Sequence, residues 1–183
     1  EKVKLKNKLK NLKKNKIGIL GGTFDPAHKG HIKISLEAKK KFDLNKVIWA
    51  ITKKNPFKEK SNISLKQRIK FAKKLNKKNN FIKIYFIENK LKSNRTVDLI
   101  SYLRKKNKYT EYYFIMGADN LVNFHKWHKW KKIASICQIL VFDRSRYKAK
   151  SLKSIAYKKF NKKSLEFINF KKVNISSSQL RKI

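Results

Sequence analysis

Six short apolar runs, separated by longer stretches with a helical pattern, constrain the fold of this chain most strongly. The runs cover residues 17–20, 47–51, 81–87, 112–116, 139–142 and 167–170, and they are nearly continuous, as in strands buried on both faces of a sheet. Amphipathic stretches lie at residues 31–42, 64–75, 95–106 and 130–136. In the first of these, Ile32, Leu36 and Ala38 are expected to face the core. The alternation predicts an α/β fold, a Rossmann-like parallel sheet with helices on both faces.

The chain is predicted to form one domain that follows a basic arm. Its 183 residues are enough for one sizeable core. We assign residues 1–16, which are rich in lysine, to an N-terminal arm, and residues 17–183 to the domain.

Nothing in the sequence points to a membrane or an oxidising compartment. No apolar run approaches membrane-spanning length, and residues 1–16 lack the apolar centre of a secretory signal. The single cysteine, Cys137, excludes an internal disulfide and a cysteine-based zinc site. We expect a cytoplasmic protein without a membrane partner, and the sequence leaves the oligomeric state open, a homo-oligomer included.

The excess of positive charge has two interpretations. The chain holds 50 Lys and Arg residues against 11 Asp and Glu residues, which suits a polyanion partner. However, the lysines are scattered from Lys2 to Lys182, and the chain is also rich in Asn, Ile and Phe, as coding sequence biased toward A and T would produce. We favour this compositional origin, although such a charge would still attract a nucleotide substrate.

The stretch GGTFDPAHKGH, residues 21–31, follows the first apolar run and has the parts of a phosphate cradle. Gly21 and Gly22 permit a sharp turn and a close approach to a ligand. A helix is predicted to begin near His28, and its first turn favours an anion. His28 and His31 share one face of that turn, and their imidazoles are compact donors able to carry charge near neutral pH.

Other interpretations of this stretch stay open. It contains neither the G-x-G-x-x-G dinucleotide fingerprint nor a Walker loop. A zinc site would need more ligands than His28, His31 and Asp25. A glycine turn with incidental histidines is also compatible with the pattern.

Four stretches in order resemble the nucleotidylyltransferase superfamily, and most closely the bacterial nicotinate-nucleotide adenylyltransferases. They are GGTFDPAHKGHI with its H-x-G-H element, SNRTVDLISYLR, FIMGADNLVNFHKWHKWKKI with its G-A-D and W-H-x-W elements, and ISSSQLR. The last has Ser178 where the family usually has Thr. The resemblance implies a fold of the nucleotidylyltransferase type and transfer of the adenylyl group of ATP to nicotinate mononucleotide, giving deamido-NAD and pyrophosphate.

In the implied reaction, the phosphate of the mononucleotide attacks the α-phosphorus of ATP in line. Because this phosphate is largely ionised near pH 7, positioning and charge neutralisation suffice. No protein side chain is expected to be a metal ligand, since Mg²⁺ would be held mainly by the ATP phosphates. The resemblance implies that ATP is bound by Gly21, Gly22, Thr23, Phe24, His28, His31, Asp119, Ser176, Ser177, Ser178 and Arg181, of which His28, His31 and Arg181 are the catalytic candidates.

The C-terminal ISSSQLR also has physical properties of its own. Ser176 and Gln179 have the spacing of a capping box, so a helix should start there. Its free N–H groups, with the hydroxyls of Ser177 and Ser178, suit the β- and γ-phosphates, and Arg181 supplies a fork for the leaving pyrophosphate. An ordinary capped terminal helix is the alternative.

The acceptor nucleotide is implied to be bound by Asn55, Lys58, Thr96 and Trp127. Trp127 would stack on the pyridine ring, while Thr96 would help to select nicotinate through backbone donors. Asn55 and Lys58 would reach the phosphate, with Arg68 a weaker candidate, and Lys58 is equally compatible with a solvated surface position. From the sequence, Asp119 could equally cap a helix.

Two rival functions remain at this stage. One is another adenylyl- or cytidylyltransferase of the same superfamily. The other is a basic nucleic-acid-binding protein that uses the arm and the surface lysines. Since four motifs match in order, a nucleic-acid partner is not expected for the main role.

Overall fold

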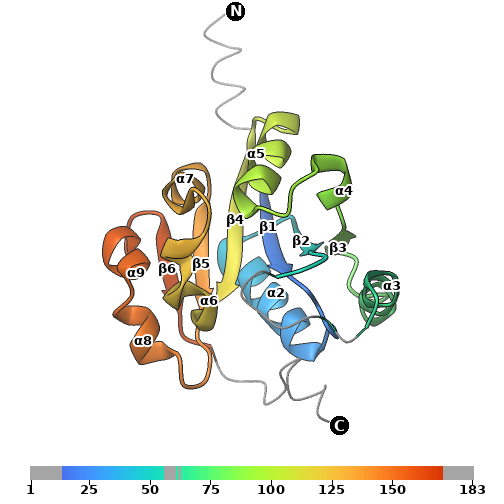
Figure 1. The fold of residues 1–183 in the computed structure, drawn as a ribbon, viewed down its shortest axis with the longest axis horizontal. Coiled ribbons are helices and arrows are strands. Elements are labelled where there is room, and N and C mark those ends of the chain that lie inside the picture. The colour runs from blue at the N-terminus through green and yellow to red at the C-terminus, as the bar shows by residue number, and fades with distance from the viewer. Residues whose placement is uncertain (1–13, 56–60, 62, 171–183) are drawn as a thin grey trace, which may run out of the picture.

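The computed structural model describes residues 14–55, 61 and 63–170, and its centre is a six-stranded, all-parallel sheet (Figure 1). The strand order is β3-β2-β1-β4-β5-β6, which is the order of a Rossmann sheet. The strands are β1 (Asn15–Gly22), β2 (Lys46–Ile51), β3 (Ile82–Tyr85), β4 (Thr110–Gly117), β5 (Gln138–Phe142) and β6 (Leu165–Ile168). The predicted fold class is confirmed.

All six predicted strands exist, and both outermost strands differ from their predicted ranges. β3 ends at Tyr85, because Ile87 already precedes a short helix. β6 begins at Leu165, two residues before the predicted start. Edge strands are covered less evenly than central ones, so Glu166 is exposed between the buried Leu165 and the half-buried Phe167. A continuous apolar run is therefore a poor guide to the limits of this strand.

The four longer helices also match their predicted ranges closely. They are α2 (Lys29–Phe42), α3 (Leu65–Leu75), α5 (Thr96–Lys106) and α7 (Trp130–Ile136). The pattern did not predict α4 (Glu88–Leu91), α6 (Ala118–Val122), the 3₁₀ turn η1 (Phe124–Lys126), α8 (Lys148–Leu152) and α9 (Ile155–Phe160). Elements of six residues or fewer are too short to display a 3.6-residue period.

Helices cover both faces of the sheet, and each face has its own core. α5, α6, α7 and α9 pack on the face that includes Ile19 and Phe114. α2 and α3 pack on the face that includes Leu20 and Trp49. In α2, the prediction was right for Ala38, which is fully buried, but wrong for Leu36, which is 38% exposed. The inward position is taken by Ser35, whose hydroxyl accepts a hydrogen bond from Trp49 Nε1 at 2.8 Å.

The order of the strands reverses at β1, and this places the ligand site. β1 pairs with β2 on one side and with β4 on the other. The chain therefore runs outward from β1 through β2 to β3, and then returns to β4 on the other side of β1. In such sheets, ligands bind beyond the carboxyl ends of the strands at the switch point. Here those ends are Gly22 of β1 and Gly117 of β4.

The first strand begins inside the segment that the sequence assigned to the arm. β1 starts at Asn15, and the side chain of Lys14 forms an ion pair with Glu111 at 3.1 Å. Residues 1–13 lie outside the described part of the chain. Within the described residues, no helix is both long and apolar enough to span a lipid bilayer.

Candidate active site

Two histidines cap the helix that follows β1. His28 is the N-cap of α2, and its Nδ1 accepts a hydrogen bond from the backbone N–H of Gly30 at 3.1 Å. His31 Nδ1 accepts from the backbone N–H of His28, also at 3.1 Å. The two imidazoles thus form a capping box, a role usually filled by Ser or Thr with Glu or Gln. Since both Nδ1 atoms accept, each neutral ring carries its proton on Nε2 and can donate to a ligand from there.

His28 is a neutral donor at physiological pH. Burial lowers the pKa of its imidazole from 6.5 to about 4, and the positive charge of Arg144 acts in the same direction. The expectation that both imidazoles are able to carry charge near neutral pH is therefore wrong for His28. A neutral Nε2–H group still binds a phosphate oxygen, and it does so without a change of protonation.

We expect the low pKa of His28 to make the protein less stable in acid. Between pH 6.5 and about 4, the unfolded His28 binds a proton that the folded one does not. The free energy of unfolding should thus be largest above pH 6.5 and fall as the pH drops toward 4. His28→Asn keeps a capping acceptor but cannot titrate. Urea titrations at several pH values should show a shallower fall for this variant, and parallel curves would contradict the assignment.

The sharp turn after β1 is made by a residue other than the predicted glycines. Gly21 and Gly22 are the last two residues of β1, and neither has a positive φ. The left-handed conformation belongs to Phe24, with φ 49°. Its ring is buried and stacks on Trp49 with centroids 4.9 Å apart, which holds the residue in place. Both glycines instead line a cavity beside the strand, where a Cβ at Gly21 would lie 3.5 Å from the ring of Phe114.

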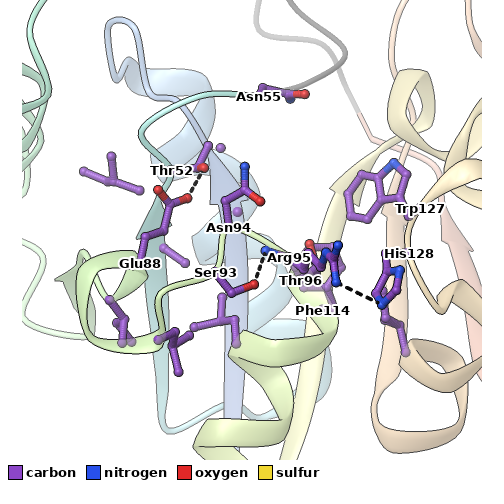
Figure 2. A pocket seen from close by; sticks show the side chains of 18 of the residues that line it. Thr52, Asn55, Glu88, Ser93, Asn94, Arg95, Thr96, Phe114, Trp127 and His128 are labelled. Carbon is purple, nitrogen blue, oxygen red and sulfur yellow. Dashed lines mark hydrogen bonds between the residues drawn. The ribbon is translucent and has the colours of Figure 1, made fainter.

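This cavity has a volume of about 310 Å³ and lies at the carboxyl ends of β1, β2 and β4, against α4 and α5 (Figure 2). Five residues predicted to bind substrates line it, namely Gly21, Gly22, Asn55, Thr96 and Trp127. The remaining described candidates, Thr23, Phe24, His28, His31 and Asp119, are not among its lining residues. The site therefore has two parts, a histidine cradle at α2 and a cavity, which are connected through the end of β1.

One end of the cavity is aromatic. Trp127 lines it and makes edge contacts with Phe114 and Phe124, at centroid distances of 6.0 Å and 5.3 Å. Trp130 packs edge-on against Phe124 and Phe160, and its side chain is half-buried against the core. Trp127 directly follows η1, whereas Trp130 is the first residue of α7. Of the two side chains, that of Trp127 lines the cavity and that of Trp130 does not.

The first turn of α5 borders the same end of the cavity. Thr96 is the first residue of the helix and lines the cavity. No side chain caps this helix start in the described structure. A first helical turn without a cap offers backbone N–H groups to a ligand.

Arg144 is a site residue that sequence reasoning missed. It follows β5 by two residues, and its Nη1 donates to Asp119 Oδ2 at 2.6 Å. Asp119 does not cap α6, whose N-cap is Gly117 without a side-chain bond. A Cβ at Gly117 would lie 2.5 Å from Asp119 Oδ1, so a larger residue there would displace the carboxylate. Because Arg144 also lowers the pKa of His28, it links the Gly117–Asp119 segment to the cradle.

Arg68 is buried away from the substrate, contrary to its prediction as a phosphate ligand. It is 2% exposed, and its guanidinium donates to the carbonyls of Thr23, Thr52 and Lys53 at 2.6, 2.9 and 3.1 Å. These carbonyls belong to the segments that follow β1 and β2. Arg68 therefore positions two loops of the site.

Glu88 is the second residue that the sequence did not reveal. Its carboxylate accepts hydrogen bonds from the hydroxyl of Thr52 and from the backbone N–H of Lys53, the latter at 3.0 Å. Glu88 and Thr52 both line the cavity. The hydrogen bond between their side chains therefore holds together the part of the cavity wall that they form. Lys58, Ser176, Ser177, Ser178 and Arg181 lie outside the described residues.

Comparison with known proteins agrees with this architecture. The cytidylyltransferase-like family model matches residues 19–183. The chain is 67% identical over 181 residues to a probable nicotinate-nucleotide adenylyltransferase of Pelagibacter ubique, covering 99% of both chains. It also resembles the nicotinic acid mononucleotide adenylyltransferase of Plasmodium falciparum complexed with NaAD, with a TM-score of 0.75 and 20% identity, covering 92% of this chain and 83% of that one. The same Plasmodium protein complexed with APC gives a TM-score of 0.73 and 20% identity, over the same shares.

The sequence match spans nearly the whole chain, and the solved structures share its fold. Sheet order, the histidine cradle at the end of β1 and the cavity beside it fit that relationship. The chain belongs to the cytidylyltransferase-like family and, within it, to the nicotinate-nucleotide adenylyltransferases.

Proposed function

We propose that the protein transfers the adenylyl group of ATP to nicotinate mononucleotide, producing deamido-NAD and pyrophosphate. The observation that carries the proposal is the joining of two different subsites at the end of β1. One is a pair of imidazole donors at a helix start, and the other is a cavity with an aromatic end. The first suits a polyphosphate and the second suits a flat ring. The relative in Plasmodium, complexed with NaAD, is consistent with such a product.

The reaction would proceed by positioning and charge stabilisation. The phosphate of the mononucleotide, largely ionised near pH 7, attacks the α-phosphorus of ATP, and pyrophosphate leaves. His28 and His31 donate from Nε2 to phosphate oxygens and stabilise charge that develops in the transition state. Arg144, which borders the cradle, adds a positive charge on the same side. A general base is unnecessary because the nucleophile has already lost its proton.

The loop between β1 and α2 supplies backbone groups to the same phosphates. Thr23 and Phe24 lie between the end of β1 and the cradle, and Arg68 fixes the carbonyl of Thr23. A loop held in this way keeps its N–H groups in place before ATP arrives, which lowers the cost of binding. Asp119, which lies in α6 and is held by Arg144, remains the candidate for the adenosine of ATP.

Mg²⁺ would enter with ATP. Among the described residues, no cluster of three or more His, Cys, Asp or Glu side chains is placed to hold a metal ion. We propose that the ion is held mainly by the substrate phosphates and water. When bound, Mg²⁺ neutralises charge on the ATP phosphates.

The acceptor nucleotide would occupy the cavity. Trp127 offers a flat face for the pyridine ring, and Thr96 at the start of α5 lies at the same end. Asn55, which lines the cavity near the end of β2, is the described candidate for its phosphate. Lys58 remains a proposal for the same phosphate.

Replacing the indole of Trp127 should weaken the binding of the acceptor nucleotide more than the binding of ATP. Trp127→Ala removes the proposed stacking face but leaves the cradle intact. We expect KM for the mononucleotide to rise by about tenfold or more, while KM for ATP stays nearly unchanged. Steady-state kinetics with each substrate varied in turn would measure this. Equal increases for both substrates would show that Trp127 serves packing instead.

Pyrophosphate release tests the proposed function. The protein is incubated with Mg²⁺, ATP or CTP, and one acceptor at a time, including nicotinate mononucleotide and the phosphate esters used by other cytidylyltransferase-like enzymes. Rapid release with ATP and nicotinate mononucleotide alone is the expected result. Release with a different pair, and none with this one, would favour the rival transferase.

A further inference from the structure

The side-chain charges that line the cavity are few, although the chain is very basic. The protein has 50 Lys and Arg residues, yet no lysine of the described residues lines the cavity. Glu88 and Arg95 are its charged lining residues within that part of the chain. Among the described residues, the guanidinium of Arg95 is therefore the lysine or arginine group that lines the cavity and can contact a ligand in it.

Within the described residues, Arg95 has no acidic partner, whereas Glu88 accepts two hydrogen bonds. Glu88 accepts from Thr52 and from the backbone of Lys53. The guanidinium of Arg95 contacts His128 instead, with Nη1 3.4 Å from His128 Nε2 (Figure 2). Because arginine can only donate, Nε2 of His128 must accept, which requires an uncharged imidazole for this bond. Among the described residues, Arg95 forms no salt bridge with a carboxylate.

The position of Arg95 matches the ring end of the cavity. It is the N-cap of α5, directly before Thr96, and its side chain reaches toward the segment that carries Trp127 and His128 (Figure 2). A ring stacked on Trp127 would have its substituent near the uncapped start of α5. There, the backbone donors of the helix and the guanidinium would face the same group.

We propose that Arg95 is a specificity-determining residue whose guanidinium binds the carboxylate on the ring of the acceptor nucleotide. This inference rests on the proposed function and assigns the group that distinguishes the acid from its amide. A carboxylate accepts from a guanidinium in a charge-assisted bond. A carboxamide carries no charge and offers one acceptor oxygen beside an NH₂ donor, so it cannot form the same charge-assisted bond through two oxygens.

The test compares two acceptors in four proteins. Nicotinate and nicotinamide mononucleotides are assayed with the wild type, Arg95→Gln, Arg95→Lys and the control Arg104→Gln. Arg104 lies on the same helix and is exposed, but it does not line the cavity. The inhibition constant of the amide against the acid is measured as well, so that selectivity is defined even where the amide turns over slowly.

Arg95→Gln should lower kcat/KM for nicotinate mononucleotide by about tenfold, mainly through KM, and leave the amide unchanged. Arg95→Lys should keep part of the selectivity, and Arg104→Gln should keep all of it. An equal loss for both acceptors in Arg95→Gln, or no loss for the acid, would overturn the inference while leaving the proposed function standing. If the wild type released no pyrophosphate with nicotinate mononucleotide, the proposed function itself would fail, and the inference with it.

Discussion

His31→Ala should lower kcat by at least about 100-fold, which corresponds to roughly 3 kcal/mol of transition-state stabilisation. The imidazole of His31 packs against that of His28, with ring centroids 3.9 Å apart, and its Nδ1 accepts from the backbone of His28. The substitution therefore removes one donor to the phosphates. It also removes the contacts that hold the second donor, His28, in position. Pre-steady-state or saturating steady-state assays of pyrophosphate release would measure the loss.

The loss of a helix cap must be separated from the loss of a donor. Ser64 caps α3 in the same way, since its hydroxyl accepts from the backbone N–H of Gln67 at 3.2 Å. Ser64→Ala should cost about 1 kcal/mol of stability and leave kcat unchanged. If Ser64→Ala and His31→Ala reduced kcat equally, helix stability would explain both. Near-normal turnover in His31→Ala would remove His31 from the mechanism.

Arg68→Ala should destabilise the fold by about 3 kcal/mol, because it deletes three hydrogen bonds from a buried guanidinium to loop carbonyls. For a chain of this length, that corresponds to a fall in Tm of about 6 to 12 °C. The pKa of Arg68 is lowered by burial, a shift opposed by the charges of Asp25 and Glu88. Calorimetry or a thermal melt followed by circular dichroism would measure the change.

Lys70→Ala is the matched control for Arg68. Lys70 lies on the same helix, two residues further on, and is exposed. Its truncation should change Tm little, as is usual for exposed positions. A Tm of Arg68→Ala close to that of the wild type would show that water replaces the three hydrogen bonds to these carbonyls with no loss of stability. The guanidinium would then contribute little to holding the two loops.

Local patterns in the sequence were sufficient to predict the central elements of the fold. The strands that became β1, β2, β4 and β5 are buried on both faces, so their apolar runs were nearly continuous. The helix start at residue 28 and the glycine pair before it also lie within one short stretch. The residues of such a stretch stay together in space whatever the rest of the chain does, which is why the cradle could be predicted.

Contacts between distant residues could not be predicted in this way. Arg144 and Asp119 are 25 residues apart, and Arg68 and Thr23 are 45 apart. In the sequence, Arg144 was not among the candidates, and Arg68 was only a weak candidate for a phosphate contact. Which one becomes buried, and which one faces a carboxylate, depends on the packing of helices across the sheet.

The protonation of His28 was also beyond the reach of sequence patterns. Its neutral state results from burial and from the charge of Arg144, which reaches it from the end of β5. The sequence places these two residues 116 positions apart. An isolated histidine has a pKa near 6.5, and only the folded surroundings lower it.

The fate of the α-phosphate of ATP tests the central claim most directly. ATP labelled at the α-phosphorus is incubated with the protein, Mg²⁺ and nicotinate mononucleotide, in parallel with ATP labelled at the γ-phosphorus. The proposed mechanism predicts that the α-label appears in a dinucleotide and the γ-label in pyrophosphate, in equal amounts. Recovery of the α-label only in AMP or ADP, with no labelled dinucleotide, would contradict it.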